Sequence, residues 1–202
     1  YLFVSASKTT SGNVSFLKDL DRPNSPLAAV DEDYSTDSYL LESEGPTFFI
    51  VTNKEAPNQK LVKATAKHPN EEYWTDVIPE TENVLSVSSG GGYFFARYMI
   101  DAITKVVQYN FKGKNIRQVD LPGVGTARGW NGKMEQKKLY YSFTNYHTPG
   151  VIYAFDADSG KSEQYWSPDI DFNPEDYISS QIFYTSADGT KVPMIITHKK
   201  GI

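Results

Sequence analysis

Short apolar runs alternate with clusters of glycine, proline, asparagine and aspartate along the whole chain. The runs are rich in tyrosine and phenylalanine and lack the spacing of three and four that an amphipathic helix shows. Aromatic side chains suit a pleated, half-buried surface, so the pattern favours strands over helices. The sequence therefore predicts an all-β fold.

Pairs of aromatic or apolar residues recur at a constant interval. They begin at positions 2, 48, 94 and 140, each 46 residues after the one before. A period in the forties, with several short strands in each unit, is typical of β-propeller blades. The four pairs are Leu2-Phe3, Phe48-Phe49, Phe94-Phe95 and Tyr140-Tyr141.

Each full repeat predicts four antiparallel strands, whereas the first unit lacks its innermost strand. The blades are expected near 1–33, 34–79, 80–122 and 123–168, which together make residues 1–174 a partial β-propeller. The predicted strands are 38–42, 47–52, 60–65 and 73–78 in the second unit, 84–88, 93–99, 104–111 and 116–121 in the third, and 127–130, 139–144, 151–156 and 162–166 in the fourth.

The repeat stops before a fifth pair. The sequence instead predicts a plain hairpin from Asp176 to Thr185 and from Lys191 to His198, joined through an Asp188-Gly189 turn. A different domain is therefore expected to begin near residue 175 and to occupy 175–202.

Two loops share a second motif. Thr52-Asn53 precedes Ala56-Pro57, and Thr144-Asn145 precedes Thr148-Pro149, displaced by 92 residues, or two repeats. Both loops join a second strand to a third, and such loops lie on one face of a propeller together with the connections between blades. Asn53 and Asn145 are candidates for contact with a ligand in a cavity on that face. Capping of a turn by the amide side chain explains them equally well.

These loop motifs, together with the terminal segment from Phe183 to Ile202, resemble the prolyl oligopeptidase family over essentially the whole chain. The terminal segment resembles the entry from the propeller of these enzymes into their α/β-hydrolase domain, and Asp188-Gly189-Thr190-Lys191-Val192-Pro193 is its most specific part. The resemblance implies a seven-bladed propeller over a hydrolase domain, cleavage of short peptides after proline, and a Ser-His-Asp set. It implies no metal and no organic cofactor.

The chain departs from the family pattern in two respects. It has about four blades rather than seven, and no Gly-x-Ser-x-Gly nucleophile elbow. We therefore expect the catalytic residues outside these 202 residues, the segment to be inactive alone, and residue 1 to be an internal point of a longer chain. The family's cavity-facing residue in the first loop is matched best by Thr10, with Lys8 beside it.

Charge and composition narrow the partners. The net charge is −5 and no long basic cluster occurs, which argues against nucleic acid or an anionic membrane as a partner. No apolar run approaches the roughly 20 residues that span a bilayer. The absence of cysteine excludes disulfides and thiolate metal sites but leaves the compartment, cytoplasmic or periplasmic, undetermined.

Several weaker motifs have plain structural interpretations. Gly90-Gly91-Gly92 is predicted to be a hairpin turn rather than a phosphate loop, and 169–173 a linker rather than a calcium loop. The Asn13 sequon lies within a predicted strand, which argues against glycosylation. Exposed loop or strand positions are expected for the histidines, and sheet packing for the tryptophans. These residues are His68, His147 and His198, and Trp74, Trp130 and Trp166.

Two alternative functions remain open from the sequence. One is a stand-alone propeller that binds a protein or a glycan, with the hairpin as a cap. The other is a dipeptidyl or acyl-peptide hydrolase of the same architecture. In either case, a partial ring exposes apolar faces at both ends, so the segment is expected to self-associate.

Overall fold

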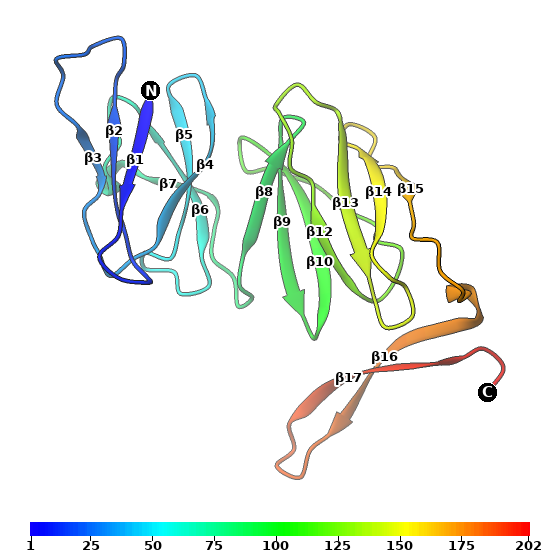
Figure 1. Ribbon diagram of the computed structural model, residues 1–202. Helices are drawn as coiled ribbons and strands as arrows, with labels where there is room; N and C mark the ends of the chain where they lie inside the picture. The colour runs from blue at the N-terminus through cyan, green and yellow to red at the C-terminus, as the bar shows by residue number, and fades with distance from the viewer. The chain divides into compact units, whose positions relative to one another are not determined.

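The computed structural model describes all residues 1–202, and its regular structure consists of β-strands and two single-turn 3-10 helices (Figure 1). The strands form one three-stranded sheet, three four-stranded sheets and a two-stranded hairpin. Repeated four-stranded antiparallel sheets are propeller-like blades, so the all-β prediction with a C-terminal hairpin is confirmed. Neither 3-10 helix has the length or apolar character needed to cross a bilayer. The chain divides into two compact units, which are residues 1–87 with 111–114, and residues 88–110 with 115–202.

The first unit contains two sheets. The first sheet has three strands, as predicted for a blade without its innermost strand. The second has four strands in sequential order, with a 3-10 helix before the last. The elements are β1 (Leu2–Ala6), β2 (Val14–Lys18) and β3 (Ala28–Asp31), then β4 (Ser38–Glu44), β5 (Thr47–Thr52), β6 (Lys60–Thr65), η1 (Glu71–Tyr73) and β7 (Thr75–Ile78).

The core of this unit forms between the faces of these two sheets. Strand β5 is buried along nearly its whole length, because Phe48 and Ile50 point to one face and Phe49 and Val51 to the other. Complete burial of each such side chain contributes about 1.5 to 3 kcal/mol. One buried cluster comprises Leu17, Val30, Phe48, Ile50, Val62 and Ala64.

The second unit contains two four-stranded sheets and the hairpin. The strands of each sheet are neighbours in sequential order. The elements are β8 (Ser86–Gly90), β9 (Tyr93–Ile100), β10 (Ile103–Asn110) and β11 (Asn115–Gln118), then β12 (Thr126–Gly129), β13 (Lys138–Thr144), β14 (Val151–Asp156) and β15 (Ser162–Trp166), and finally η2 (Pro174–Asp176), β16 (Tyr177–Thr185) and β17 (Lys191–Lys199).

Aromatic rings dominate the core of the second unit. Trp130 is almost completely buried and stacks on Tyr141 at a centroid distance of 4.3 Å, with Phe95 on its other side. Gly129 precedes it at φ 142°, and a Cβ there would lie 2.4 Å from the Tyr140 carbonyl oxygen. Only glycine allows strand β12 to approach so closely. Trp130 thus fills the sheet packing role that its sequence position predicts, whereas Trp166 is half exposed.

The observed strands follow the predicted ones with informative shifts. The last strand of the second sheet begins at Thr75 rather than at residue 73, because Glu71–Tyr73 first forms a 3-10 turn. Strand β8 begins at Ser86 rather than at residue 84, since the Leu85 amide donates to the carbonyl of Asn58 instead. Gly91 and Gly92 have positive φ values, which confirms the predicted hairpin turn.

Candidate functional site

Two kinds of connection lie at the same end of the strands within each unit. In an up-and-down four-stranded sheet, the loop between the second and third strands and the link to the next sheet lie at the same end. In the first unit these are loops 7–13 and 53–59 and the link 32–37. In the second unit they are the turn 101–102, the loop 145–150 and the segment 167–176 that leads to the hairpin. We call these connections the loop edge of each unit.

Lys8 and Thr10 lie in the exposed loop between β1 and β2. The Lys8 ammonium sits 4.0 Å from the centre of the Tyr34 ring, a cation–π contact with the link to the next sheet. The Gly12 amide at the end of the loop donates to Asp37 Oδ1 at 2.8 Å. The loop is therefore anchored at its base, while Thr10 remains exposed to solvent.

Asn53 ties the next loop to the same link. Its Oδ1 accepts the Asp37 amide at 2.7 Å, and its own amide donates to the Asp37 carbonyl at 3.2 Å. The Asn53 side-chain amide also points at Asp37 Oδ2, 3.4 Å away. Both polar atoms of the side chain are thus engaged with the link that begins strand β4.

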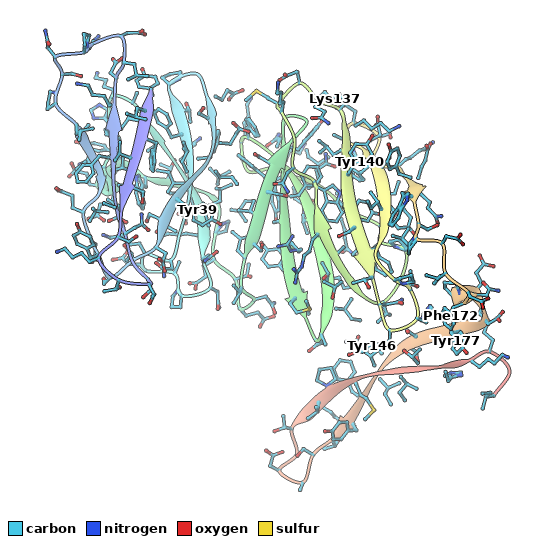
Figure 2. The ribbon with its side chains drawn as sticks, viewed as in Figure 1. Tyr39, Lys137, Tyr140, Tyr146, Phe172 and Tyr177 are labelled. Carbon is cyan, nitrogen blue, oxygen red and sulfur yellow. The ribbon has the colours of Figure 1, made fainter.

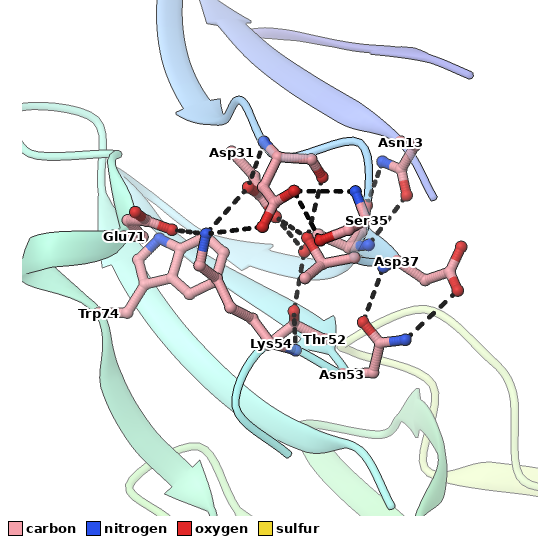
Figure 3. Close-up of polar contacts among 12 residues, drawn as sticks. Asn13, Asp31, Ser35, Asp37, Thr52, Asn53, Lys54, Glu71 and Trp74 are labelled. Atoms are coloured by element: carbon pink, nitrogen blue, oxygen red, sulfur yellow. Dashed lines mark hydrogen bonds and ion pairs between the residues drawn. The ribbon is translucent and has the colours of Figure 1, made fainter. Parts of the chain in front are cut away.

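Lys54 follows and enters an acidic cluster (Figure 3). Its ammonium lies 3.6 Å from Asp31 Oδ1, 3.8 Å from Asp33 Oδ2 and in contact with Glu71. The Asp31 side chain is completely buried, and its Oδ2 accepts hydrogen bonds from Thr36 and Ser38. A buried carboxylate needs such partners, because removal of an ion from water is costly.

The charges of this cluster shift two pKa values. Hydrogen bonds from the Ser35 hydroxyl and amide lower the pKa of Asp33, with a smaller contribution from Lys54. Burial by itself lowers the pKa of Lys54, but the hydrogen bond to Glu71 and the charges of Asp31, Glu71 and Asp33 outweigh it, so the pKa is raised. An acidic hollow of about 220 Å³ adjoins the cluster and is lined in part by Glu32 and Glu72.

Asn145 in the second unit caps its own loop instead. Its Oδ1 accepts the amides of His147 at 3.1 Å and Thr148 at 2.7 Å. Its Nδ2 donates to the Val124 carbonyl at 3.1 Å, which fixes the loop to the link between the two sheets. The structure shows the turn-capping role for this residue.

The residues that follow Asn145 point outward to the hairpin. Tyr146 is 78% exposed at the end of the loop (Figure 2). The His147 Nδ1 atom lies 2.8 Å from Ser179 Oγ on β16, and Ser179 Oγ lies 2.7 Å from Thr197 Oγ1 on β17. His147 is therefore half-buried in a hydrogen-bonded contact, so the exposed position expected from the sequence is wrong for this histidine.

A short turn leaves room for the hairpin. Strands β9 and β10 are joined by only Asp101 and Ala102, at φ 49° and 66°, a left-handed conformation that favours glycine. Gln181 of β16 donates a hydrogen bond to the Asp101 carbonyl. A cavity of about 270 Å³ lies between this turn, the loop 145–150 and the hairpin. Its lining includes Ala102, Val124, Gly125, Tyr146 and Ile195.

The segment that joins the last sheet to the hairpin is itself ordered by local contacts. Asn173 Oδ1 accepts the Glu175 amide, and Asn173 Nδ2 donates to Asp176 Oδ1, so these side chains hold the η2 turn. The Phe172 ring packs against Tyr177 at a centroid distance of 5.0 Å. The structure shows no group of three or more histidine or acidic side chains arranged to hold a metal ion.

Of the four site residues predicted from the sequence, Lys8, Thr10 and Asn53 lie in the first unit and Asn145 in the second. Within the first unit, the Asp37 link connects the loop of Thr10 to that of Asn53. Sequence reasoning missed Lys54 and the role of His147. The sequence did contain a signal for both residues. They stand at the variable positions of the repeated loop motif, where the two loops carry different side chains.

Comparison with known proteins gives a consistent result. Residues 1–168 match the family described as "Prolyl oligopeptidase, N-terminal beta-propeller domain". The prolyl endopeptidase of Elizabethkingia miricola is 50% identical over 202 residues, and that of Elizabethkingia meningoseptica 46%. Each alignment covers the whole of this chain and 28% of the relative, so the chain spans little more than a quarter of their length.

Solved structures agree with the sequence relatives. A prolyl endopeptidase matches 99% of this chain and 29% of its own, with a TM-score of 0.82 at 33% identity. Prolyl oligopeptidase B from Galerina marginata matches 98% of this chain and 29% of its own, with a TM-score of 0.86 at 25% identity. The similarity therefore extends beyond residue 168 into the hairpin.

Proposed function

Because the chain belongs to the prolyl oligopeptidase family, as part of its N-terminal β-propeller region, we propose that it forms part of the lid of a serine peptidase that hydrolyses short peptides after proline. The observation that carries the proposal is the similarity to prolyl endopeptidases along all 202 residues. The catalytic residues lie elsewhere in that longer enzyme. In this proposal the lid selects substrates by exclusion.

The loop edge faces the catalytic cleft in this proposal. The chain leaves the last sheet at this edge, and the hairpin that follows touches the turn 101–102 and the loop 145–150. Residues 1–174 then belong to the propeller, and 175–202 begin the α/β-hydrolase domain. The loops 52–58 and 144–150 face the substrate cavity, with Lys8, Thr10, Asn53 and Asn145 at or near its wall.

In this proposal the lid selects substrates by their size. A peptide must pass the lid before it reaches the serine, so a short unstructured chain enters and a folded protein does not. Separation of lid and hydrolase domain gates this entry, a motion of the microsecond to millisecond kind. The binding partners are therefore short proline-containing peptides and the hydrolase domain of the same chain.

The test uses the full-length enzyme and one proline-containing sequence in two contexts. The sequence is presented as a free peptide of about ten residues and as a loop of a folded protein, and cleavage sites are read by mass spectrometry. We expect cleavage after proline in the peptide only, and none in a variant without the nucleophilic serine. Cleavage of both substrates at similar rates, or none after proline in the peptide, would overturn the proposal.

A further inference from the structure

The hairpin has two chemically different faces. In a hairpin, residues two apart and their cross-strand partners share a face. One face carries Ser179 and Gln181 on β16, opposite Thr197 and Ile195 on β17. The other face carries Ser180 and His198 together with exposed apolar side chains, which are Ile178 at 44%, Ile182 and Met194 at 40% and Ile196 at 37%.

The face with Ser179 and Gln181, which also carries Tyr177 and Phe183, is the one that meets the loop edge. Ser179 contacts His147 of the loop 145–150, and Gln181, two residues on, donates to the carbonyl of Asp101 in the neighbouring turn. Strand β16 thus binds two connections of the second unit, the loop 145–150 through Ser179 and the turn 101–102 through Gln181. Ile195, opposite Gln181, closes the 270 Å³ cavity between them.

The backbone at His147 is held in place within its loop. Asn145 Oδ1 accepts the backbone amide of His147, and Asn145 Nδ2 anchors the loop to the Val124 carbonyl. Ser179 is held in turn by Thr197, its direct cross-strand partner. The His147 backbone and the Ser179 side chain are therefore held before they meet, so the hydrogen bond forms with less loss of conformational freedom than between free groups.

We propose that His147, Ser179 and Gln181 form a polar latch, a separable contact that holds the hairpin against the loop edge and opens when the lid moves. Its chemistry suits repeated opening, because water replaces side-chain hydrogen bonds at small net cost, whereas separation of apolar surfaces exposes them to water. The exposed apolar side chains of the opposite face then belong to the permanent packing of the catalytic domain. The latch deepens the proposed function and rests on it for the statement that the lid opens.

Hydrogen exchange of the full-length protein tests the latch directly. The variants His147→Leu and Ser179→Ala each remove one side of the bond, and the double variant removes both. His147→Leu deletes the hydrogen bond to Ser179, and Ser179→Ala deletes the bond to Thr197 as well. We therefore expect amides in 145–150 and 177–185 to exchange about fivefold faster in His147→Leu and at least as fast in Ser179→Ala. The double variant is expected to exchange no faster than the faster single variant, since both act on one bond.

Matched controls lie on the same hairpin. Ser180→Ala alters the neighbouring position on the opposite face, and His198→Leu removes a histidine whose Nδ1 contacts only the adjacent Lys199 carbonyl. Both are expected to leave exchange in 145–150 unchanged. His147→Asn keeps a polar group near the position of Nδ1 and is expected to restore protection.

Three results would overturn the latch. They are unchanged exchange in both single variants, equal acceleration by the controls, and a double variant whose effect is the sum of the singles. The measurement does not depend on peptide cleavage, so a failure of the proposed function is recognised separately. If the latch gates entry, His147→Leu also raises kcat/KM for long peptides relative to short ones, and an unchanged ratio would remove the gating role.

Discussion

The loops 52–57 and 144–149 carry the same Thr-Asn-x-x-(Ala/Thr)-Pro motif but use it in opposite ways. In the first, Asn53 reaches back to Asp37 and Lys54 turns inward to a buried carboxylate. In the second, Asn145 closes its own loop and His147 turns outward to the hairpin. Threonine and proline stand at the two ends of the motif in both loops. The two variable positions between them decide whether the loop stabilises its own sheets or contacts the hairpin.

The largest expected difference between the two loops is the loss of stability when the residue after the motif asparagine is replaced. Lys54→Met deletes the cation beside Asp31, whose side chain is completely buried, and is expected to lower the free energy of unfolding by about 2 to 3 kcal/mol. Tyr146→Met, at the matching position of the other loop, is expected to change it by less than about 0.5 kcal/mol, since Tyr146 is 78% exposed.

Urea unfolding of the two variants beside the wild type measures this difference. The slope of the unfolding free energy against urea must stay constant for the comparison to hold. A loss below about 0.5 kcal/mol in Lys54→Met would show that Lys54 does not stabilise the cluster. The inward role assigned to the first loop would then be wrong.

The asparagines of the two loops are also expected to differ in how much stability is lost when each is replaced by aspartate. Asn53→Asp places a carboxylate where Nδ2 now points at Asp37 Oδ2 from 3.4 Å, and repulsion is expected to cost about 1.5 kcal/mol. Asn145→Asp keeps the acceptor for the amides of His147 and Thr148, but turns a carboxylate oxygen toward the Val124 carbonyl in place of the Nδ2 donor, at about 1 kcal/mol.

Thermal or urea unfolding at neutral pH ranks these two variants. The Asn53→Asp loss should also shrink at high salt, where repulsion is screened, while that of Asn145→Asp should not. An Asn145→Asp variant as unstable as Asn53→Asp would contradict the different partners that the structure gives them.

Much of the fold follows from local pattern. The 46-residue period places each sheet, and strands such as β5, β6 and β14 have the predicted bounds. The prediction succeeds there because alternation and turn residues act within a few positions of each other. The predicted strand bounds are wrong where a residue bonds to a group far away in the sequence. An example is Leu85, whose amide donates to the Asn58 carbonyl rather than to the sheet.

The site is less predictable for the same physical reason. The motif locates Asn53 and Asn145 in equivalent loops, yet their hydrogen bonds go to Asp37 in one case and to the loop itself in the other. The partners of Lys54 come from residues 31, 33 and 71, and that of His147 from residue 179. Such contacts depend on how strands pair in space, which one sequence does not specify.

The smallest expected effect is a change in the stability of the protein at alkaline pH, through Lys54 of the first loop. Because the folded-state pKa of Lys54 is raised above its ordinary 10.5, its contribution to stability is complete below that pH and is lost as pH rises through the folded value. Lys54→Arg keeps a cation that does not titrate in this range. The stability of this variant should therefore fall less steeply between about pH 9 and 12 than that of the wild type.

Tyrosines also titrate in this range, but they are common to both proteins. Burial, for example, raises the pKa of Tyr98 to about 12, and its ionisation weakens wild type and variant alike. The difference between the two stability curves therefore isolates Lys54. Parallel curves would show that its ammonium is no better accommodated in the folded protein than in the unfolded chain, and the acidic cluster would then be a surface feature, as open to solvent as the loop of Tyr146.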